Sequence, residues 1–477
     1  MHINQLSSID HIVVLMLENR SFDEMLGLLY SARGNVSPSG QPFEGLTGHE
    51  SNPGTGGKAV PVFTIAPTDP YAYFMPGADP GEGYKATNSQ LFGSTTAPTP
   101  PVATNDGFVA DFSYTLGWES KEGWSILPGT TANSIMGVFP PSMLPVLSGL
   151  ASGFAVCDHW FSSAPTETLP NRAFVNAGTS QGRLNDDTTP YTCPSIFGLL
   201  SDHKVTWSIY GYNEPPLTRG DFTDTTNADD SHFGEFTDFT AAAAKGTLAG
   251  YTFLEPSWDA SGNSQHPNYN VALGEQLLHD VYYALRNGPG WNRTLLIITY
   301  DEHGGCYDHV PPPSGATPPD NSVGQYGFDF KRFGVRVPTV LVSPLIPAGT
   351  VFRVAGTPLD HTSILKTIET RWNLPALTAR DAAANGVGAA LILTKPRKDD
   401  PLHGVIVPVA TGQNPDEDRP SHLQEVHAAL VAQLPVVDKE GGTHHAMPLL
   451  KTNRDYKVYI RARTSAWRNS RRVVKPS

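Results

Sequence analysis

The sequence predicts an α/β fold in three layers, in which a mostly parallel central sheet lies between helices. Apolar runs at 11–17 and 294–300 lack any alternation of polar and apolar residues, which is typical of strands buried on both faces. The segments 268–287 and 360–372 carry apolar residues at helical spacing. Helices that alternate with buried strands indicate a parallel sheet covered on both faces.

The first strand is expected at 11–17, where the chain reads HIVVLML. Glu18 and Asn19 follow it directly. Ser21 and Glu24 stand three residues apart, which is the spacing of a helix capping box, and apolar residues continue the predicted helix. Glu18 and Asn19 are therefore expected between the carboxyl end of a strand and the start of a helix.

Residues 33–135 differ in composition from the segments around them. Gly, Pro, Ser and Thr dominate, with aromatic residues scattered among them. This composition predicts a long loop-rich insertion with short helices over one end of the core. Loops of such length often serve as lids or binding loops, and a decorated surface loop is the alternative.

The remaining elements follow the same alternation. A short strand is expected at 153–161, and a helix at 268–287 precedes the strand at 294–300. A further buried strand is expected at 334–344. The helix at 360–372 begins with capping residues.

The chain divides into one large domain and a C-terminal extension. We expect residues 1–400 to form a single domain that contains the insertion, and residues 401–477 to add one amphipathic helix and a basic tail. Residues 451–477 hold nine Lys or Arg and one acid. Such a tail either packs against the acidic body of its own protein or contacts an external anionic partner, which is a membrane or a nucleic acid. The net charge of the whole chain is −13, so no nucleic-acid partner is expected.

The N-terminus and the hydropathy pattern bear on localisation. The start of the chain lacks a basic segment, and its apolar run is short for a signal peptide. No stretch approaches 18 uninterrupted apolar residues. We therefore expect a soluble, cytoplasmic protein, unless a route without a signal peptide exports it.

Polar residues gather where predicted strands end, which is where open parallel sheets hold their ligand sites. They are Glu18 and Asn19, the loop 166–172, and Asp301 and Glu302. Carboxylates placed together repel one another unless a cation lies between them. An oxygen-rich set with an Asn amide suits a hard divalent ion.

Four motifs in a fixed order resemble a known family. They are ENRSFD at 18–23, TLPNR at 168–172, DEHGGCYDHV at 301–310 and GVRVPTVLVSP at 334–344. Together they resemble the phosphoesterase family that contains bacterial and plant non-specific phospholipases C and a bacterial acid phosphatase. The resemblance covers roughly Asp10 to Leu374. It implies an alkaline-phosphatase-like fold and a catalytic role for the domain at 1–400.

The resemblance also implies a role for each matched residue. One divalent metal ion would be held by Glu18, Asn19, Asp301, Glu302 and Thr168. Thr168 occupies the position of the family's nucleophile, and His266 and His303 would assist it. Substrate would be bound by Arg172, Asn171, His159 and His309. Oxygen ligands of this kind admit calcium, zinc, magnesium or manganese.

The expected activity is metal-dependent hydrolysis of a phosphoester through a phosphothreonine intermediate. A threonine hydroxyl is a poor nucleophile until a base or a metal ion activates it. Phospholipid phosphodiesters, cleaved as by a phospholipase C, are the first expectation for the substrate. An acid phosphatase acting on small phosphomonoesters is the alternative. A non-catalytic phosphate- or lipid-binding protein on the same fold is an alternative of another class.

Overall fold

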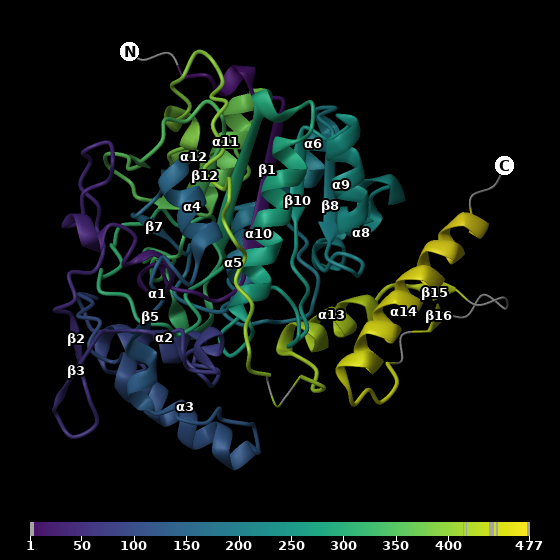
Figure 1. Cartoon of the computed structure of the whole chain (residues 1–477). Coiled ribbons are helices and arrows are strands. Elements are labelled where there is room, and N and C mark those ends of the chain that lie inside the picture. The colour runs from purple at the N-terminus through teal and green to yellow at the C-terminus, as the bar shows by residue number, and fades with distance from the viewer. Residues whose placement is uncertain (1–3, 414, 416, 438–442, 445–446, 475–477) are drawn as a thin grey trace.

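The computed structural model describes residues 4–413, 415, 417–437, 443–444 and 447–474 (Figure 1). Its centre is a sheet with the strand order β13-β6-β12-β11-β1-β10-β8-β9. The strands of this sheet are β1 (His11–Leu17), β6 (Ala155–Val156), β8 (Trp207–Gly211), β9 (Phe233–Glu235), β10 (Tyr251–Leu254), β11 (Thr294–Tyr300), β12 (Val340–Val342) and β13 (Thr350–Val351). Neighbouring strands run parallel, except that β12 runs antiparallel to both of its neighbours. The predicted mostly parallel sheet is confirmed.

Helices cover both faces of this sheet (Figure 1). On one face, α10 (Val271–Arg286) packs against α4 (Pro145–Gly153) and α9 (Phe236–Lys245). On the other, α11 (Thr362–Trp372) packs against α5 (Thr168–Ala177), which in turn contacts α6 (Ile196–Asp202). The predicted α/β/α arrangement is therefore confirmed.

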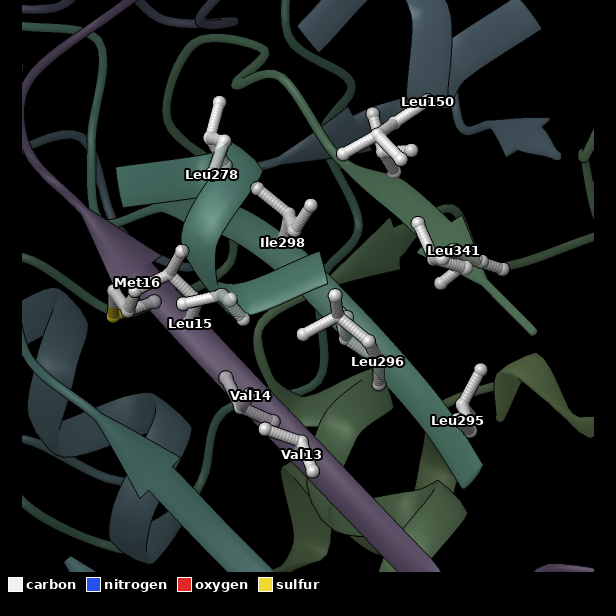
Figure 2. Packing of buried hydrophobic residues seen from close by; sticks show 14 of the residues in the cluster. Val13, Val14, Leu15, Met16, Leu150, Leu278, Leu295, Leu296, Ile298 and Leu341 are labelled. Atoms are coloured by element: carbon white, nitrogen blue, oxygen red, sulfur yellow. The ribbon is translucent and has the colours of Figure 1, made fainter. Parts of the chain in front are cut away.

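The two central strands, β1 and β11, lie in the middle of the hydrophobic core. All of β11 and six of the seven residues of β1 are buried. Figure 2 shows their side chains in one cluster with Leu150 of α4 and Leu278 of α10. The two strands pair in parallel, with Leu17 opposite Tyr300. This register brings the residues that follow the two strands, Glu18 and Asp301, to the same edge of the sheet.

The N-terminal helix begins as the capping pattern predicts. In α1 (Phe22–Leu26), the Ser21 hydroxyl accepts a hydrogen bond of 3.2 Å from the backbone N–H of Glu24. Glu18 and Asn19 therefore lie between the end of β1 and the start of α1.

The insertion contains more regular structure than its composition suggests. Its elements are β2 (Ser51–Pro53), β3 (Ala59–Pro61), β4 (Phe63–Thr64), α2 (Tyr84–Phe92) and α3 (Phe108–Glu122), and β5 (Gly137–Val138) follows. Phe108 and Phe112 of α3 join a small core of their own with Tyr307 and Val335 of the main body. The expected short helices thus include one of 15 residues, α3, because this second core stabilises it.

Two predicted strands are shorter than expected. The segment 153–161 divides into β6 and β7 (Trp160–Phe161), and β7 pairs with β14 (Leu359–Asp360) in a separate small sheet. The segment 334–344 contributes only β12, which runs antiparallel. Pro338 interrupts that segment because it has no N–H to donate.

The C-terminal segment packs back onto the body. Its elements are α13 (His422–Ala432), β15 (Val436–Val437), β16 (Thr443–His444) and α14 (Asn453–Val474), and α12 (Ala379–Ala383) precedes them in the body. Two short helices of the body, α7 (Thr218–Asp221) and α8 (Thr223–Asn227), lie nearby, and α13 contacts both α7 and α14. None of the described helices is both long and apolar enough to cross a bilayer.

The basic residues of α14 bind the protein's own surface. Lys457 lies 2.8 Å from Asp259, Arg461 lies 2.8 Å from Glu235, and Arg468 lies 3.2 Å from Asp230. Arg471 donates to the backbone carbonyl of Thr226 in the body, whereas Arg463 donates to that of Leu434, just after α13. The sequence left two partners open for this tail, and these contacts favour the acidic body over a membrane.

Candidate active site

Asp301 joins the polar residues at the ends of β1 and β11 to α5. Its Oδ1 accepts hydrogen bonds from the backbone N–H groups of Asn19, at 2.9 Å, and Glu302, at 2.8 Å. Its Oδ2 accepts from the Arg172 guanidinium, with N–O distances of 2.9 and 3.0 Å. All of these groups are buried. Asp301 therefore fixes the positions of its neighbours, and both of its oxygens already have donors.

Two glycines after this pair allow the chain to pass close to the site. Gly304 and Gly305 have φ values of 59° and 66°, a region that residues with a Cβ seldom adopt. A Cβ on Gly304 would lie 2.0 Å from the carbonyl oxygen of Asn19, and one on Gly305 would lie 2.6 Å from that of Gly81. The motif thus needs glycine at both positions.

Thr168 is the first residue of α5 and is 1% exposed. Its hydroxyl lies 3.2 Å from Oδ1 of Asn19, to which it donates a hydrogen bond. The backbone N–H of Asn19 in turn donates to Asp301. Asn19 therefore connects Thr168 to the motif at 301–310, which follows β11. Three of the four motifs, which lie far apart in the sequence, therefore meet at one point.

Two buried carboxylate oxygens here have no hydrogen-bond partner among the described residues. They are Oε2 of Glu18 and Oε1 of Glu302. Burial raises the pKa of Glu18 to about 7 and raises the pKa of Glu302 well above its usual range. Unpaired buried carboxylates beside an Asn amide and a hydroxyl form a donor set that hard divalent cations prefer. The residues present thus fit a divalent metal ion.

The insertion supplies two further acids that the sequence did not single out, Asp79 and Glu82, and they lie beside His266. Asp79, Glu82 and His266 each bring one ligand atom within 4.8 Å of the others. The amide nitrogen of Asn19 donates to Glu82, which links this group to Thr168. His266 donates from Nδ1 to the carbonyl of Pro267, 2.9 Å away, so Nε2 remains to face Glu82 at 3.9 Å.

Comparison with known proteins agrees with this arrangement. Residues 9–375 match the Phosphoesterase family, and this stretch contains every residue placed at the site so far. The chain belongs to the phosphoesterase family. Members hydrolyse phosphoric ester bonds, and this phosphoesterase is accordingly a hydrolase of that class.

Named relatives span most of the phosphoesterase. Non-specific phospholipase C6 of Arabidopsis thaliana is 38% identical over 434 residues, which cover 86% of this chain and 78% of the relative. Non-specific phospholipase C3 of the same plant is 35% identical and covers 83% and 76%. Non-hemolytic phospholipase C of Burkholderia pseudomallei is 27% identical and covers 76% and 55%.

Solved structures resemble the phosphoesterase only weakly. A protein in the alkaline phosphatase superfamily from Vibrio parahaemolyticus has 13% identity and a TM-score of 0.32, covering 69% of this chain and 82% of that one. Such a likeness adds nothing to what the sheet and its two helix layers show directly.

His303 lies behind Glu302 in the phosphoesterase. Its Nδ1 lies 3.1 Å from Glu302, and its Nε2 lies 2.7 Å from Oε1 of Gln90. Gln90 donates its amide hydrogens to Asp111 and Gly81, so its oxygen must face His303. Burial lowers the pKa of His303 to about 3. The neutral imidazole thus donates from Nε2 to Gln90, and its unprotonated Nδ1 packs against Glu302.

Two of the predicted substrate-binding residues hold other parts of the protein. Arg172 uses Nε and Nη2 for Asp301 and the carbonyl of Leu17. Only its Nη1 is buried without a partner among the described residues. The Asn171 side chain bonds the backbone of the loop at 164–167, including the N–H and the carbonyl of Ala164. Asn171 thus shapes the loop that presents Thr168.

The other two predicted substrate-binding residues have partners of their own elsewhere. The imidazole of His159 lies 3.7 Å from Glu44. The imidazole of His309 bonds Asp23 at 2.6 Å. Asp23, Asp308 and His309 also bring ligand atoms within 4.8 Å of one another, but Arg336 bonds both carboxylates at 2.9 Å. An arginine already balances the charge of that cluster.

His361 orders the β11 motif from the opposite layer. Its Nε2 donates to the carbonyl of Asp301 at 2.6 Å, while its Nδ1 accepts from the indole of Trp160 at 3.3 Å. Burial lowers the pKa of His361 to about 4, so the neutral form fits both bonds. The sequence predicts capping residues at the start of the helix at 360–372, and the His361 side chain forms no such cap.

The C-terminal segment reaches Thr168. A small cavity at the threonine is lined by Glu18, Glu82, Trp258, His266, Tyr269, Ser421, His422 and Leu423. His422 opens α13 and lies 3.0 Å from Asp186, whose other oxygen accepts from the N–H of Leu169. Burial opposes its charge, but the hydrogen bond and charge of Asp186 raise the pKa of His422 to about 9. Sequence patterns gave no signal for His422 beyond its place at a helix start.

Proposed function

We propose that this phosphoesterase cleaves phospholipid phosphodiesters as a phospholipase C does, with Thr168 as its nucleophile. The observation that carries the proposal is the buried Thr168 hydroxyl, which donates to Asn19 and shares a small cavity with Glu18, whose Oε2 has no described partner. The relatives named phospholipase C in plants and bacteria support the same substrate class.

Glu18, Asn19, Asp301, Glu302 and Thr168 would hold one divalent cation. When bound, the cation lowers the pKa of the threonine hydroxyl and neutralises charge on the phosphoryl oxygens. The identity of the ion stays a prediction among calcium, zinc, magnesium and manganese. The amide of Asn19 holds the hydroxyl in one direction, which favours in-line attack.

In the first half-reaction, the Thr168 hydroxyl loses its proton to solvent, Oγ1 attacks phosphorus and the bond to the glycerol oxygen breaks. The departing alkoxide takes a proton from Nε2 of His266, which is doubly protonated at this step because Nδ1 keeps its bond to the carbonyl of Pro267. The product is diacylglycerol, and the phosphorylated head group stays on Thr168. In the second half-reaction, water attacks that phosphothreonine after giving a proton to the same nitrogen, and the head-group phosphate leaves.

The test compares wild type with Thr168→Ala on p-nitrophenyl phosphorylcholine and p-nitrophenyl phosphate. We expect Thr168→Ala to lose about 10³-fold or more in turnover, as losses of covalent nucleophiles do, with an unchanged melting temperature. Thr168→Ser keeps a hydroxyl and serves as the control. EDTA should abolish turnover, and added divalent cation should restore it.

Three results would contradict parts of this proposal. Near-full activity of Thr168→Ala would exclude the nucleophile, and activity that survives EDTA would exclude the cation. A strong preference for p-nitrophenyl phosphate would favour the acid phosphatase alternative. Binding of both esters without turnover by the wild type would favour a non-catalytic protein.

A further inference from the structure

A groove of about 740 Å³ lies between α2, α3 and the loop at 79–83. Its walls include Pro80, Ala86, Ala110, Tyr114 and Trp118. Cavities of this size are typical of sites for small organic molecules. None of the roles assigned above uses it.

One wall of the groove faces solvent with large aromatic side chains. Tyr114 is 76% exposed and Trp118 is 50% exposed, and they stand one turn apart on α3. Trp124, just beyond the end of the helix, is 41% exposed. Figure 1 shows α3 at the edge of the molecule, beyond α2. Exposed aromatic clusters mark interaction sites, and Tyr and Trp are the residues that proteins place at bilayer surfaces.

The groove adjoins the cavity at Thr168 through lining residues that they share with a second cavity. Asp79, Glu82 and Trp118 line the groove and also line a second cavity of about 330 Å³. Glu82 and His266 line this second cavity and also the small one at Thr168. A molecule with its phosphate at Thr168 can therefore extend along α3 to the exposed aromatic residues.

Hydrogen bonds tie the wall of the groove to the strand-end motif. Glu119 of α3 accepts from the N–H of Asp79 at 3.1 Å. Gln90 of α2 donates to Asp111 of α3 and accepts from His303, which contacts Glu302. The groove and the carboxylates thus belong to one hydrogen-bonded frame, which fixes the distance between them.

We propose that this groove and the exposed aromatic face of α3 bind the acyl chains of a phospholipid at a bilayer surface. This inference rests on the proposed function, and it identifies the surface through which the lipid reaches Thr168. Asp79, Glu82, Asp111 and Glu119 line the groove against a single Lys85, and the chain carries a net charge of −13. This charge disfavours an anionic bilayer, so the surface bound is a zwitterionic one.

The test is the double variant Tyr114→Ser/Trp118→Ser, with Val323→Ser as the matched control. Val323 is an 86% exposed apolar residue outside the groove lining. We expect the double variant to lose about 10-fold or more in kcat/KM on phosphatidylcholine vesicles, because two aromatic anchors are removed. Hydrolysis of soluble p-nitrophenyl phosphorylcholine should change by less than about twofold, since no group at Thr168 is altered.

Vesicle sedimentation of the Thr168→Ala protein isolates binding from chemistry. It should bind phosphatidylcholine vesicles better than vesicles rich in anionic lipid, and adding Tyr114→Ser/Trp118→Ser should remove that binding. Vesicle hydrolysis that falls no further than in Val323→Ser, or that falls equally on both substrates, overturns the inference. So does light scattering that shows a dimer dissociated by the double variant, since α3 would then be an interface between copies.

The experiment separates this inference from the proposed function. A wild type that hydrolyses the soluble ester but neither binds nor cleaves vesicles overturns the lipid groove alone. A wild type that hydrolyses neither ester contradicts the proposed function. In that case, sedimentation of the Thr168→Ala protein still decides whether the groove binds lipid.

Discussion

At the residue scale, the charged groups of the site differ in whether a neighbouring group balances their charge. Glu18 and Glu302 are buried with outer oxygens that no described residue bonds, whereas Asp301 has a donor on each oxygen. His422 carries the opposite charge at the mouth of the same cavity and pairs with Asp186. Because these groups differ in this way, single substitutions should change the stability of the protein by amounts that depend on pH or on close packing.

We expect the His422–Asp186 pair to stabilise the fold in a pH-dependent way. The pKa of His422 is raised from 6.5 to about 9, so the folded state holds the proton more tightly than the unfolded state. This contribution is fully present below about pH 6.5 and is lost as the pH rises through about 9. The melting-temperature gap between wild type and His422→Gln should therefore be widest near pH 6 and close by about pH 10.

His49→Gln, which replaces an exposed histidine, controls for the loss of an imidazole and should show no such trend. A gap for His422→Gln that stays constant from acid to alkaline pH would show that His422 acts by packing alone.

Gly304→Ala should be strongly destabilising, because its Cβ would meet the carbonyl oxygen of Asn19 at 2.0 Å and its φ is 59°. We expect a loss of about 2–4 kcal/mol in the free energy of unfolding. Gly315→Ala has a φ of 91° with nothing within 4 Å of the new Cβ, and it should lose only about 1 kcal/mol. Urea unfolding measures both, and equal losses would contradict the close approach.

At the level of elements, one arginine joins two segments that flank the site. Arg336 donates to Asp23 of α1 and to Asp308 of the segment after β11, each at 2.9 Å, and all three side chains are fully buried. It also donates to the backbone carbonyls of Glu44 and Asp158. Elements distant in the sequence are thus tied through one guanidinium.

Arg336→Leu should cost about 3–5 kcal/mol of stability, because it leaves two buried carboxylates without their partner. Activity should fall as well, since both ENRSFD and DEHGGCYDHV contribute to that ion pair. Lys331→Leu removes an exposed cation from Asp329 and should cost less than about 1 kcal/mol. Chemical denaturation measures the difference, and similar losses in the two variants would show that the buried pair adds no stability.

Elements with a local signal could be predicted from the sequence, and those set by tertiary contacts could not. The strands β1 and β11 match the apolar runs 11–17 and 294–300 residue for residue, because burial on both faces leaves an uninterrupted apolar pattern. The direction of β12 depends on which neighbours it meets, and no local pattern encodes that. The length of α3 depends on its packing against Tyr307 and Val335.

The same division applies to the site residues. Thr168, Asn19 and Asp301 stand in motifs, and the structure brings them together. Glu82 and His422 come from the insertion and the C-terminal segment, where composition suggests only loops and a helix start. The assisting role expected of His303 stays a prediction. Its Nε2 bonds Gln90 and its Nδ1 contacts Glu302, a position that depends on where α2 places Gln90.

At the scale of the whole molecule, the C-terminal segment lies outside the family match at 9–375, and it completes the cavity at Thr168. Leu423, Val426 and Leu430 of α13 pack with Leu169 and Trp258 beside Thr168. The opposite side of α13 packs on α14. The cations of α14 also pair with acids of the body. The tail therefore supports the helix that carries His422.

Removing residues 451–477 should lower both stability and turnover. The deletion uncovers Ala428, Val431 and Leu434, which pack with Tyr456, Ile460 and Trp467. Burying each large side chain contributes about 1.5–3 kcal/mol, so α13 would loosen and His422 would lose its fixed place near Thr168. We expect a melting temperature lower by several degrees and about a 10-fold fall in turnover of p-nitrophenyl phosphorylcholine. Arg461→Gln, which removes one surface cation and keeps the helix, should change neither. Full turnover by the truncated protein would show that α13 holds its position without α14, and a loss confined to vesicle substrates would assign the tail to membrane contact instead.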